Sequence, residues 1–392
     1  MPESHRTLNR FILLYALAWA GGTIGYVPLL SILLPVQVAG LVGKTAGVDW
    51  LAYIALIGAI AASLAGILFG YLSDITRNRR GWIVGGLVLS CVMLPVIGQM
   101  NSLPALVVSI VVWQLGLNMM LGPLAAWAGD VVPDNQKGML GGLMAFAPGL
   151  GALAGALVTV PGLAVGTVRL ILVATMVAGC VLPVLLHGAP MQASPSGKKS
   201  EHLRDQPSHS PVMRMWLARL FVQVAEATLF AYLFLWLISL DPSVSDNQTA
   251  RLFSLILLVS APLALLVGGW SDRRGRPIAS LQACAFTSAF GLVGMALAPD
   301  KMGAMLAYVL FGLSSAMFLA LHSAQTLRIL PKPDRRARDL GLFNLANTAP
   351  SLVMPWLTMA LVPWAGFPAL FGLLAVLSAA AGLMLRNMPS TS

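Results

Sequence analysis

Residues 70–81 read GYLSDITRNRRG, and residues 268–277 read GGWSDRRGRP. Each run joins a Ser-Asp pair to clustered arginines, and each lies between two strongly apolar segments. The pair at 73–74 aligns with the pair at 271–272 at an offset of 198 residues, about half of the 392-residue chain. A polar run that recurs at half the chain length predicts two copies of one structural unit.

The segments around these runs have the composition of membrane-spanning segments. Hydrophobic residues make up 58% of the chain and charged residues only 10%, whereas soluble domains carry about 25% charged residues. The apolar stretches are continuous and roughly 20 residues or longer, which predicts membrane-spanning helices rather than barrel strands. We expect an all-α membrane protein with twelve transmembrane helices in two six-helix halves and almost no strand. The predicted spans are 11–38, 49–72, 81–99, 103–126, 138–160, 166–187, 214–240, 249–270, 277–297, 302–326, 339–361 and 365–386.

The distribution of basic residues predicts the topology. The net charge is +10, a value that by itself also fits a nucleic-acid-binding protein. With the N-terminus inside, however, 20 of the 24 Lys and Arg residues fall in cytoplasmic segments, as the positive-inside rule requires. The basic residues outside are Lys44, Arg169, Arg251 and Lys301. We therefore expect both termini in the cytoplasm, possible partners among anionic lipid headgroups, and no nucleic-acid partner.

No sequence pattern indicates an enzyme. Nucleotide-binding loops, zinc-ligand spacings and nucleophile elbows are absent from the sequence, so we expect no catalytic residue, cofactor or metal. Cys91, Cys180 and Cys284 all fall inside predicted spans and are interpreted as small apolar core residues. The first span is too long for a signal-peptide core and is interpreted as a retained helix.

A polar segment divides the chain into its two halves. Residues 188–213 are rich in Ser, Pro and charge, which predicts a flexible cytoplasmic linker between halves 1–187 and 214–392. A second repeat supports this division, because PDNQKGMLG at 133–141 aligns with PDRRARDLG at 333–341. The halves are expected to share one parallel orientation.

The span count, the halves and these loops resemble the major facilitator superfamily of secondary transporters. The run at 268–277 follows the superfamily's loop pattern, with Trp270 where a leucine is usual. The run at 70–81 is looser, since Ile75 stands at a usually basic position, and it resembles sugar-cation symporters of the glycoside-pentoside-hexuronide type. The run RDLGLFNLANTAPSLVMP at 338–355 is similar to sucrose-type symporters.

The resemblance implies a cytoplasmic gate at the two loops. Their aspartates would face helix N-termini and their arginines would bind carboxylates, which stabilises the outward-facing state. Asp130 is the expected partner of the first cluster, and Asp334 or Asp339 of the second. The alternative is that these charges only set topology. The candidate gate residues are Gly70, Asp74, Arg77, Asp130, Asp272, Arg273, Gly275 and Arg276.

Glu226 is the acidic residue that lies well inside a predicted span. A charge at this depth costs roughly 3 kcal/mol, so an intramembrane acid is a candidate functional group. Arg219, Gln223 and Glu226 form one polar stripe along a helix. We expect Glu226 to couple transport to protons, with Arg219 and His322 as further candidates. The alternatives for Glu226 are a static ion pair or an acid that bonds to an amide and only holds the helix in place. The alternative for His322 is a structural role.

Several polar and aromatic residues are candidates for a solute cavity. Aromatic rings on the first span could stack on a sugar or a drug, and amides on other spans could hydrogen-bond a polar solute, although each could equally be ordinary helix packing. The candidates are Tyr15, Trp19, Tyr26, Gln114, Asn118, Gln223, Asn344 and Asn347.

Together these features predict a proton-coupled secondary active transporter of a small organic solute, working by alternating access. Sugar-like import is favoured over efflux. No acid occurs between Leu51 and Ser73, where the resemblance to sugar-sodium symporters would imply the carboxylates of a sodium site, and this argues against sodium coupling. The alternatives are drug or metabolite efflux, since APGLGALAG at 147–155 partly resembles a motif of drug-proton antiporters, and a receptor that does not transport. We expect a monomer in contact with membrane lipid, in a bacterial inner membrane.

Overall fold

The part of the chain that the computed structural model describes is mostly helical, and no strand occurs among these residues. The described residues are 2–132, 140, 143, 144, 146–188, 209–329 and 336–386. The all-α fold class is therefore confirmed. The predicted linker lies mostly outside the described residues.

The helices group into two compact units, which are described separately. Unit 1 comprises Met1–Gly197 and Ser245–Leu255, and unit 2 comprises Lys198–Val244 and Ile256–Ser392. The first residues of helix α10 (Asp246–Arg273) belong to unit 1, although the rest of α10 belongs to unit 2. The division into halves 1–187 and 214–392 stays a prediction.

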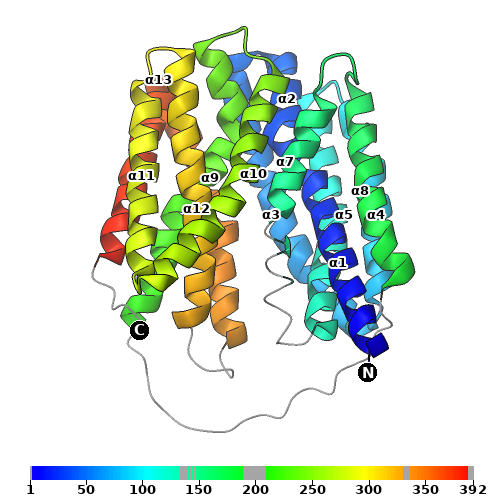
Figure 1. The fold of residues 1–392 in the computed structure, drawn as a ribbon. Coiled ribbons are helices and arrows are strands. Elements are labelled where there is room, and N and C mark those ends of the chain that lie inside the picture. Colours follow the sequence, from blue (N-terminus) through cyan, green and yellow to red (C-terminus); the bar gives the residue numbers. More distant parts are fainter. Residues whose placement is uncertain are drawn as a thin grey trace. The chain divides into compact units, whose positions relative to one another are not determined.

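In unit 1, α1 packs against α7 and α8, while α5 packs against α3 and α4 (Figure 1). The helices of this unit are α1 (Pro2–Pro28), α2 (Leu34–Val42), α3 (Lys44–Thr76), α4 (Arg79–Gly98), α5 (Leu103–Val131), α7 (Ala147–Val158) and α8 (Thr167–His187).

The first predicted span is one continuous run of helix with an irregular turn inside it. A π-helical segment, η1 (Leu29–Leu33), follows Pro28 and joins α1 to α2. The Ser31 hydroxyl donates to the Val27 carbonyl across this segment at 2.6 Å. π-Turns inside longer helices occur frequently at functional sites.

In unit 2, α9 packs against α12 and α13, and α11 packs against the same two helices. Besides the later part of α10, the helices of this unit are α9 (His209–Leu240), α11 (Pro277–Leu297), α12 (Lys301–Ile329) and α13 (Arg336–Leu385). The backbone of α13 is not helical at Gly366, where φ is +71°. This break separates the two predicted spans 339–361 and 365–386.

Ten of the described helical segments are long and apolar enough to cross a membrane. One of them, Ala349–Leu385, contains the break at Gly366 and so covers parts of two predicted spans. The fifth predicted span, 138–160, is described as a helix of only 12 residues, Ala147–Val158. The protein is thus an integral membrane protein, and the count of twelve spans stays a prediction.

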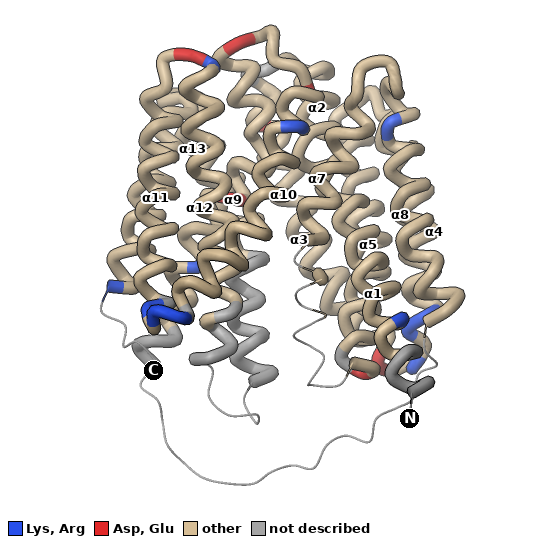
Figure 2. The backbone as a smooth tube through the Cα atoms, viewed as in Figure 1, with Lys and Arg blue, Asp and Glu red and all other residues tan. Residues whose placement is uncertain are grey.

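The basic residues of each unit gather near one end of its helices. Figure 2 shows Lys and Arg near the start of α1 in unit 1 and near the connection of α10 to α11 in unit 2. This asymmetry has the form that the positive-inside rule predicts for a membrane protein.

Candidate functional site

Glu226 lies near the middle of the membrane-spanning part of α9, which runs from Met213 to Leu240. Its side chain is half-buried, and Gln223 donates to its Oε2 atom at 3.2 Å. Among the residues that the structure describes, no cation lies within ion-pair distance of Glu226. A carboxyl group held by one neutral amide can accept or release a proton without breaking a salt bridge.

Arg219 lies two helical turns before Glu226 and reaches α12 instead. Its NH1 atom donates to the Ser323 hydroxyl at 2.9 Å and lies 3.4 Å from Nδ1 of His322. The predicted polar stripe therefore divides into two groups: Gln223 bonds to Glu226 on α9, whereas Arg219 bonds to side chains of α12.

His322 is fully buried, and its contacts determine its tautomer. Its Nε2 atom lies 2.9 Å from the Met215 carbonyl oxygen. Because a carbonyl only accepts, Nε2 must carry the hydrogen; because a guanidinium only donates, Nδ1 must offer its lone pair to Arg219. A second proton on Nδ1 would point at the guanidinium. These contacts favour a neutral imidazole that positions Arg219.

The aromatic candidates of unit 1 form a ladder along α1. The rings of Tyr15 and Trp19 are stacked with centroids 6.4 Å apart, and Phe11 continues the row at 6.0 Å from Tyr15. Tyr15 is buried, whereas Trp19 and Tyr26 are half-buried. Trp19 and Tyr26 are accordingly better placed than Tyr15 to meet a solute.

The amide candidates of unit 1 are bonded to each other on α5. Asn118 donates to the backbone oxygen of Gln114 at 2.9 Å and to its Oε1 atom at 3.3 Å. Gln114 is buried and Asn118 is half-buried. Asn344 and Asn347 lie on α13, but their side chains are outside the described part of the chain.

The first loop motif forms an ion-pair network in unit 1. Arg79 contacts Asp130 through Nε at 2.6 Å and Asp74 through NH1 at 2.7 Å, and it donates to the Ser73 hydroxyl at 2.9 Å. Asp130 thus meets the first arginine cluster, but through Arg79 rather than through Arg77. Arg77 is exposed and ends α3 with a left-handed φ of +49°.

Gly70 lies one turn before this network in α3, and a side chain there would meet no other atom within 4 Å. Gly70 therefore does not enable a close helix contact in this structure. Its carbonyl accepts from the Ser73 hydroxyl at 2.8 Å.

The second loop motif is a hydrogen-bonded turn in unit 2. Ser280 donates to the Ser271 hydroxyl at 2.8 Å, and Ser271 donates to the Arg276 carbonyl at 3.1 Å. Gly275 makes the turn possible, because its φ of +63° suits glycine. Arg273 and Arg276 are exposed.

The remaining candidates of the second motif are not tested by contacts. The side chain of Asp272 lies outside the described part of the chain, and so do Asp334 and the side chain of Asp339. Trp270 stands where the family pattern usually has leucine. The guanidinium carbon of Arg274 lies 4.3 Å from the centroid of its ring. This cation–π contact gives Trp270 a role that leucine could not fill.

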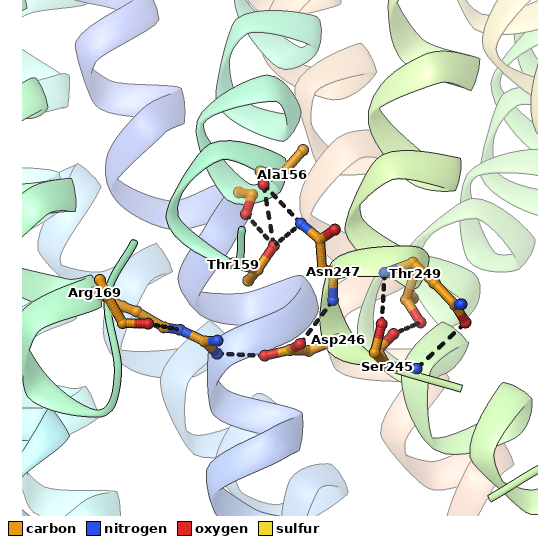
Figure 3. Close-up of polar contacts among 10 residues, drawn as sticks. Ala156, Thr159, Arg169, Ser245, Asp246, Asn247 and Thr249 are labelled. Atoms are coloured by element: carbon orange, nitrogen blue, oxygen red, sulfur yellow. Dashed lines mark hydrogen bonds and ion pairs between the residues drawn. The ribbon is translucent and has the colours of Figure 1, made fainter. Parts of the chain in front are cut away.

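The polar contacts at the start of α10 were not expected from the sequence. Arg169 forms an ion pair with Asp246, and the Asn247 amide binds the end of α7 (Figure 3). A readable signal exists at 245–248, where SDNQ has the S-x-x-Q form of a capping box. Ser245 and Gln248 do bond reciprocally, at 3.1 Å and 3.4 Å. Ser323 and Arg79 were also missed.

No group of His, Cys, Asp and Glu side chains within the described residues is arranged to hold a metal ion.

No curated protein sequence matches the chain. The fold, by contrast, matches solved transporters. A peptide transporter, POT, superimposes with a TM-score of 0.73 at 15% identity, over 96% of this chain and 93% of the other.

Two other solved structures are similar over nearly their whole length. The nucleoside transporter NupG gives a TM-score of 0.70 at 13% identity, covering 96% of this chain and 98% of the other. A D-xylose-proton symporter gives 0.67 at 15% identity, covering 97% and 98%. The family profile described as Major Facilitator Superfamily matches residues 11–313 and 215–391. With the repeated loop motif, the membrane-length helices and this match over most of its length, the chain belongs to the major facilitator superfamily and is a transporter rather than an enzyme.

Proposed function

We propose that this protein is a proton-coupled secondary active transporter of a small organic solute and that Glu226 carries the proton. The observation that supports this most is the position of Glu226 at the centre of a membrane span with a neutral amide, Gln223, as its described hydrogen-bond donor. An ionised carboxylate at this depth costs roughly 3 kcal/mol, so protonation is favoured whenever no cation is close.

Arg219 adds the second element of the coupling. It is held on α12 by Ser323 and His322, at a distance from Glu226 that leaves the carboxyl free of a direct ion pair. A movement of α9 against α12 would change the field of Arg219 at Glu226, and so would couple proton release to a change of conformation. In this proposal His322 positions Arg219 and does not itself carry the proton.

The solute is proposed to be a polar, sugar-like molecule. Trp19 and Tyr26 on α1 offer half-buried rings, and Asn118 on α5 offers a half-buried amide. A ring with several hydroxyl groups suits this combination of aromatic faces and amide groups. The similar folds of a D-xylose-proton symporter and a nucleoside transporter fit this class of solute. Efflux of a drug or metabolite is the competing direction.

The orientation belongs to the same proposal. The basic ends of both units would face the cytoplasm, so that both termini lie in the cytoplasm. The membrane would be a bacterial inner membrane, and the protein would act as a monomer. The Arg79 network of unit 1 would then stand on the cytoplasmic side, where breaking it would favour the inward-open state.

The test is solute uptake into proteoliposomes under an imposed pH gradient, screened over labelled sugars, nucleosides and amphipathic drugs. We expect the wild type to accumulate at least one polar solute, and Glu226→Gln to exchange that solute without accumulating it. Asp241→Asn is the matched control, because it makes the same chemical change outside the membrane spans. Accumulation by Glu226→Gln equal to that of the wild type would refute the coupling role.

A further inference from the structure

The start of α10 is attached to unit 1 by an ion pair at the ends of two helices. Asp246, in the first turn of α10, pairs with Arg169, in the first turn of α8 (Figure 3). The two side chains are only 17% and 19% exposed. A cation is unfavourable at the N-terminus of a helix, so Arg169 is stabilised at its position by Asp246 and by the Ala164 carbonyl, to which it donates at 3.1 Å.

A buried amide makes the second part of the attachment. The Nδ2 atom of Asn247 donates to the Ala156 carbonyl at 3.0 Å and to the Thr159 hydroxyl at 3.1 Å. Asn247 is 4% exposed and Thr159 is 1% exposed. The Thr159 hydroxyl also donates to the Ala156 carbonyl at 3.2 Å, so Asn247 adds a second donor to a carbonyl in the last turn of α7.

The third part is a small apolar contact one turn further along α10. Ala250 packs with Ala156 of α7 and with Ile32, and Val36 covers the group. Ile32 belongs to the π-helical segment η1. The attachment therefore ends on the one described stretch of the first span where the backbone departs from α-helical geometry.

One continuous helix thus belongs to two compact units. The residues up to Leu255 group with unit 1, and the residues from Ile256 onward group with unit 2. Any displacement between the units must either bend α10 or detach its first turns from α7 and α8. Detachment is the easier of the two, because the contacts are polar, lie at helix ends and can be replaced by water, and because the apolar part is small.

We propose that Asp246, Asn247 and Ala250 form a releasable latch, which separates from Arg169, from the end of α7 and from η1 in every transport cycle. The proposal rests on the protein being a transporter that changes conformation, but it does not rest on the role of Glu226. The latch lies at the helix ends opposite the Arg79 network of unit 1, so its release would open the outer side.

The test measures how fast a membrane-impermeant thiol reagent, added from outside, labels Ala250→Cys in a chain whose three cysteines are replaced by alanine. Ala250 is 1% exposed, so labelling reports separation of the latch. We expect Asp246→Asn and Arg169→Gln each to raise the labelling rate about tenfold, the population shift of a partly buried ion pair. The exchange Arg169→Asp with Asp246→Arg should bring the rate back toward that of the parent.

Ala304→Cys is the matched control, because Ala304 is equally buried in the first turn of α12, in unit 2. Its labelling should not change in the latch variants. Equal labelling of Ala250→Cys in the parent and in both single variants would overturn the latch, and so would a parallel rise at Ala304→Cys, which would mean general loosening. Labelling needs neither solute nor a proton gradient, so its result is independent of the test of Glu226.

Discussion

At the scale of single residues, the ends of the helices determine which arginine of the first loop motif pairs with the acidic residues. The spacing of the family pattern predicts Arg77, but α3 ends there with a left-handed turn, and the side chain is exposed. Arg79 begins the next helix after the capping residue Asn78, and it returns to Asp74 and Asp130. The sequence predicted that an arginine would pair with Asp130. Which arginine does so depends on where α3 ends and α4 begins.

Arg79→Ala should therefore destabilise the protein more than Arg77→Ala. Removing Arg79 leaves Asp130 and Asp74 close together without their shared cation, and we expect a loss of about 1 to 2 kcal/mol after allowing for the exposure of both carboxylates. Arg77→Ala should change stability by less than about 0.5 kcal/mol. Thermal unfolding in detergent, followed with a dye that reacts with the native cysteines, measures both; equal melting temperatures for the two variants would contradict the assigned network.

At the scale of helices, most of the fold was predictable because continuous apolar runs of membrane length have few other stable forms. The π-helical segment at Leu29–Leu33 was not predictable in the same way: a proline such as Pro28 permits a bend, but a bend can be made by several backbone geometries. The attachment of the start of α10 to unit 1 depends on tertiary packing, which periodicity does not report.

The contact of α4 with α5 gives a prediction at this scale. A Cβ atom added at Gly86 would lie 2.7 Å from the Gly116 carbonyl oxygen and closer still to the Met120 amide, both of which are backbone atoms. Gly86→Ala should force the helices apart and cost at least about 2 kcal/mol. Gly179→Ala on α8 meets no atom within 4 Å and should be neutral or stabilising by up to about 1 kcal/mol. The melting temperatures of the two variants test this; the same value for both would disprove tight packing at Gly86.

At the scale of the whole molecule, the positions of the basic residues predict how the chain is oriented in the membrane. Two of the four basic residues predicted to lie outside are paired with acids, Arg169 with Asp246 and Lys301 with Asp241 at 3.3 Å. Pairing lowers the cost of placing a cation on the side that the positive-inside rule disfavours.

The sequence predicted the transporter class and the central acid, because an intramembrane carboxylate stands out by composition alone. The amide beside Glu226, Gln223, lies on the same predicted helical stripe. The sequence did not predict that Arg219 contacts Ser323 and His322, because these contacts depend on how α9 packs against α12.

If protons move with the solute through Glu226, transport must change the pH inside proteoliposomes, which an entrapped pH-sensitive dye measures. Adding the identified solute outside, without an imposed gradient, should acidify the lumen for symport or make it alkaline for antiport. We expect Glu226→Gln to abolish this pH change while solute exchange continues, and His322→Gln, which can still donate to Met215 and accept from Arg219, to retain it. A solute-driven pH change of full size in Glu226→Gln, or none in the wild type, would show that Glu226 does not couple protons to the solute.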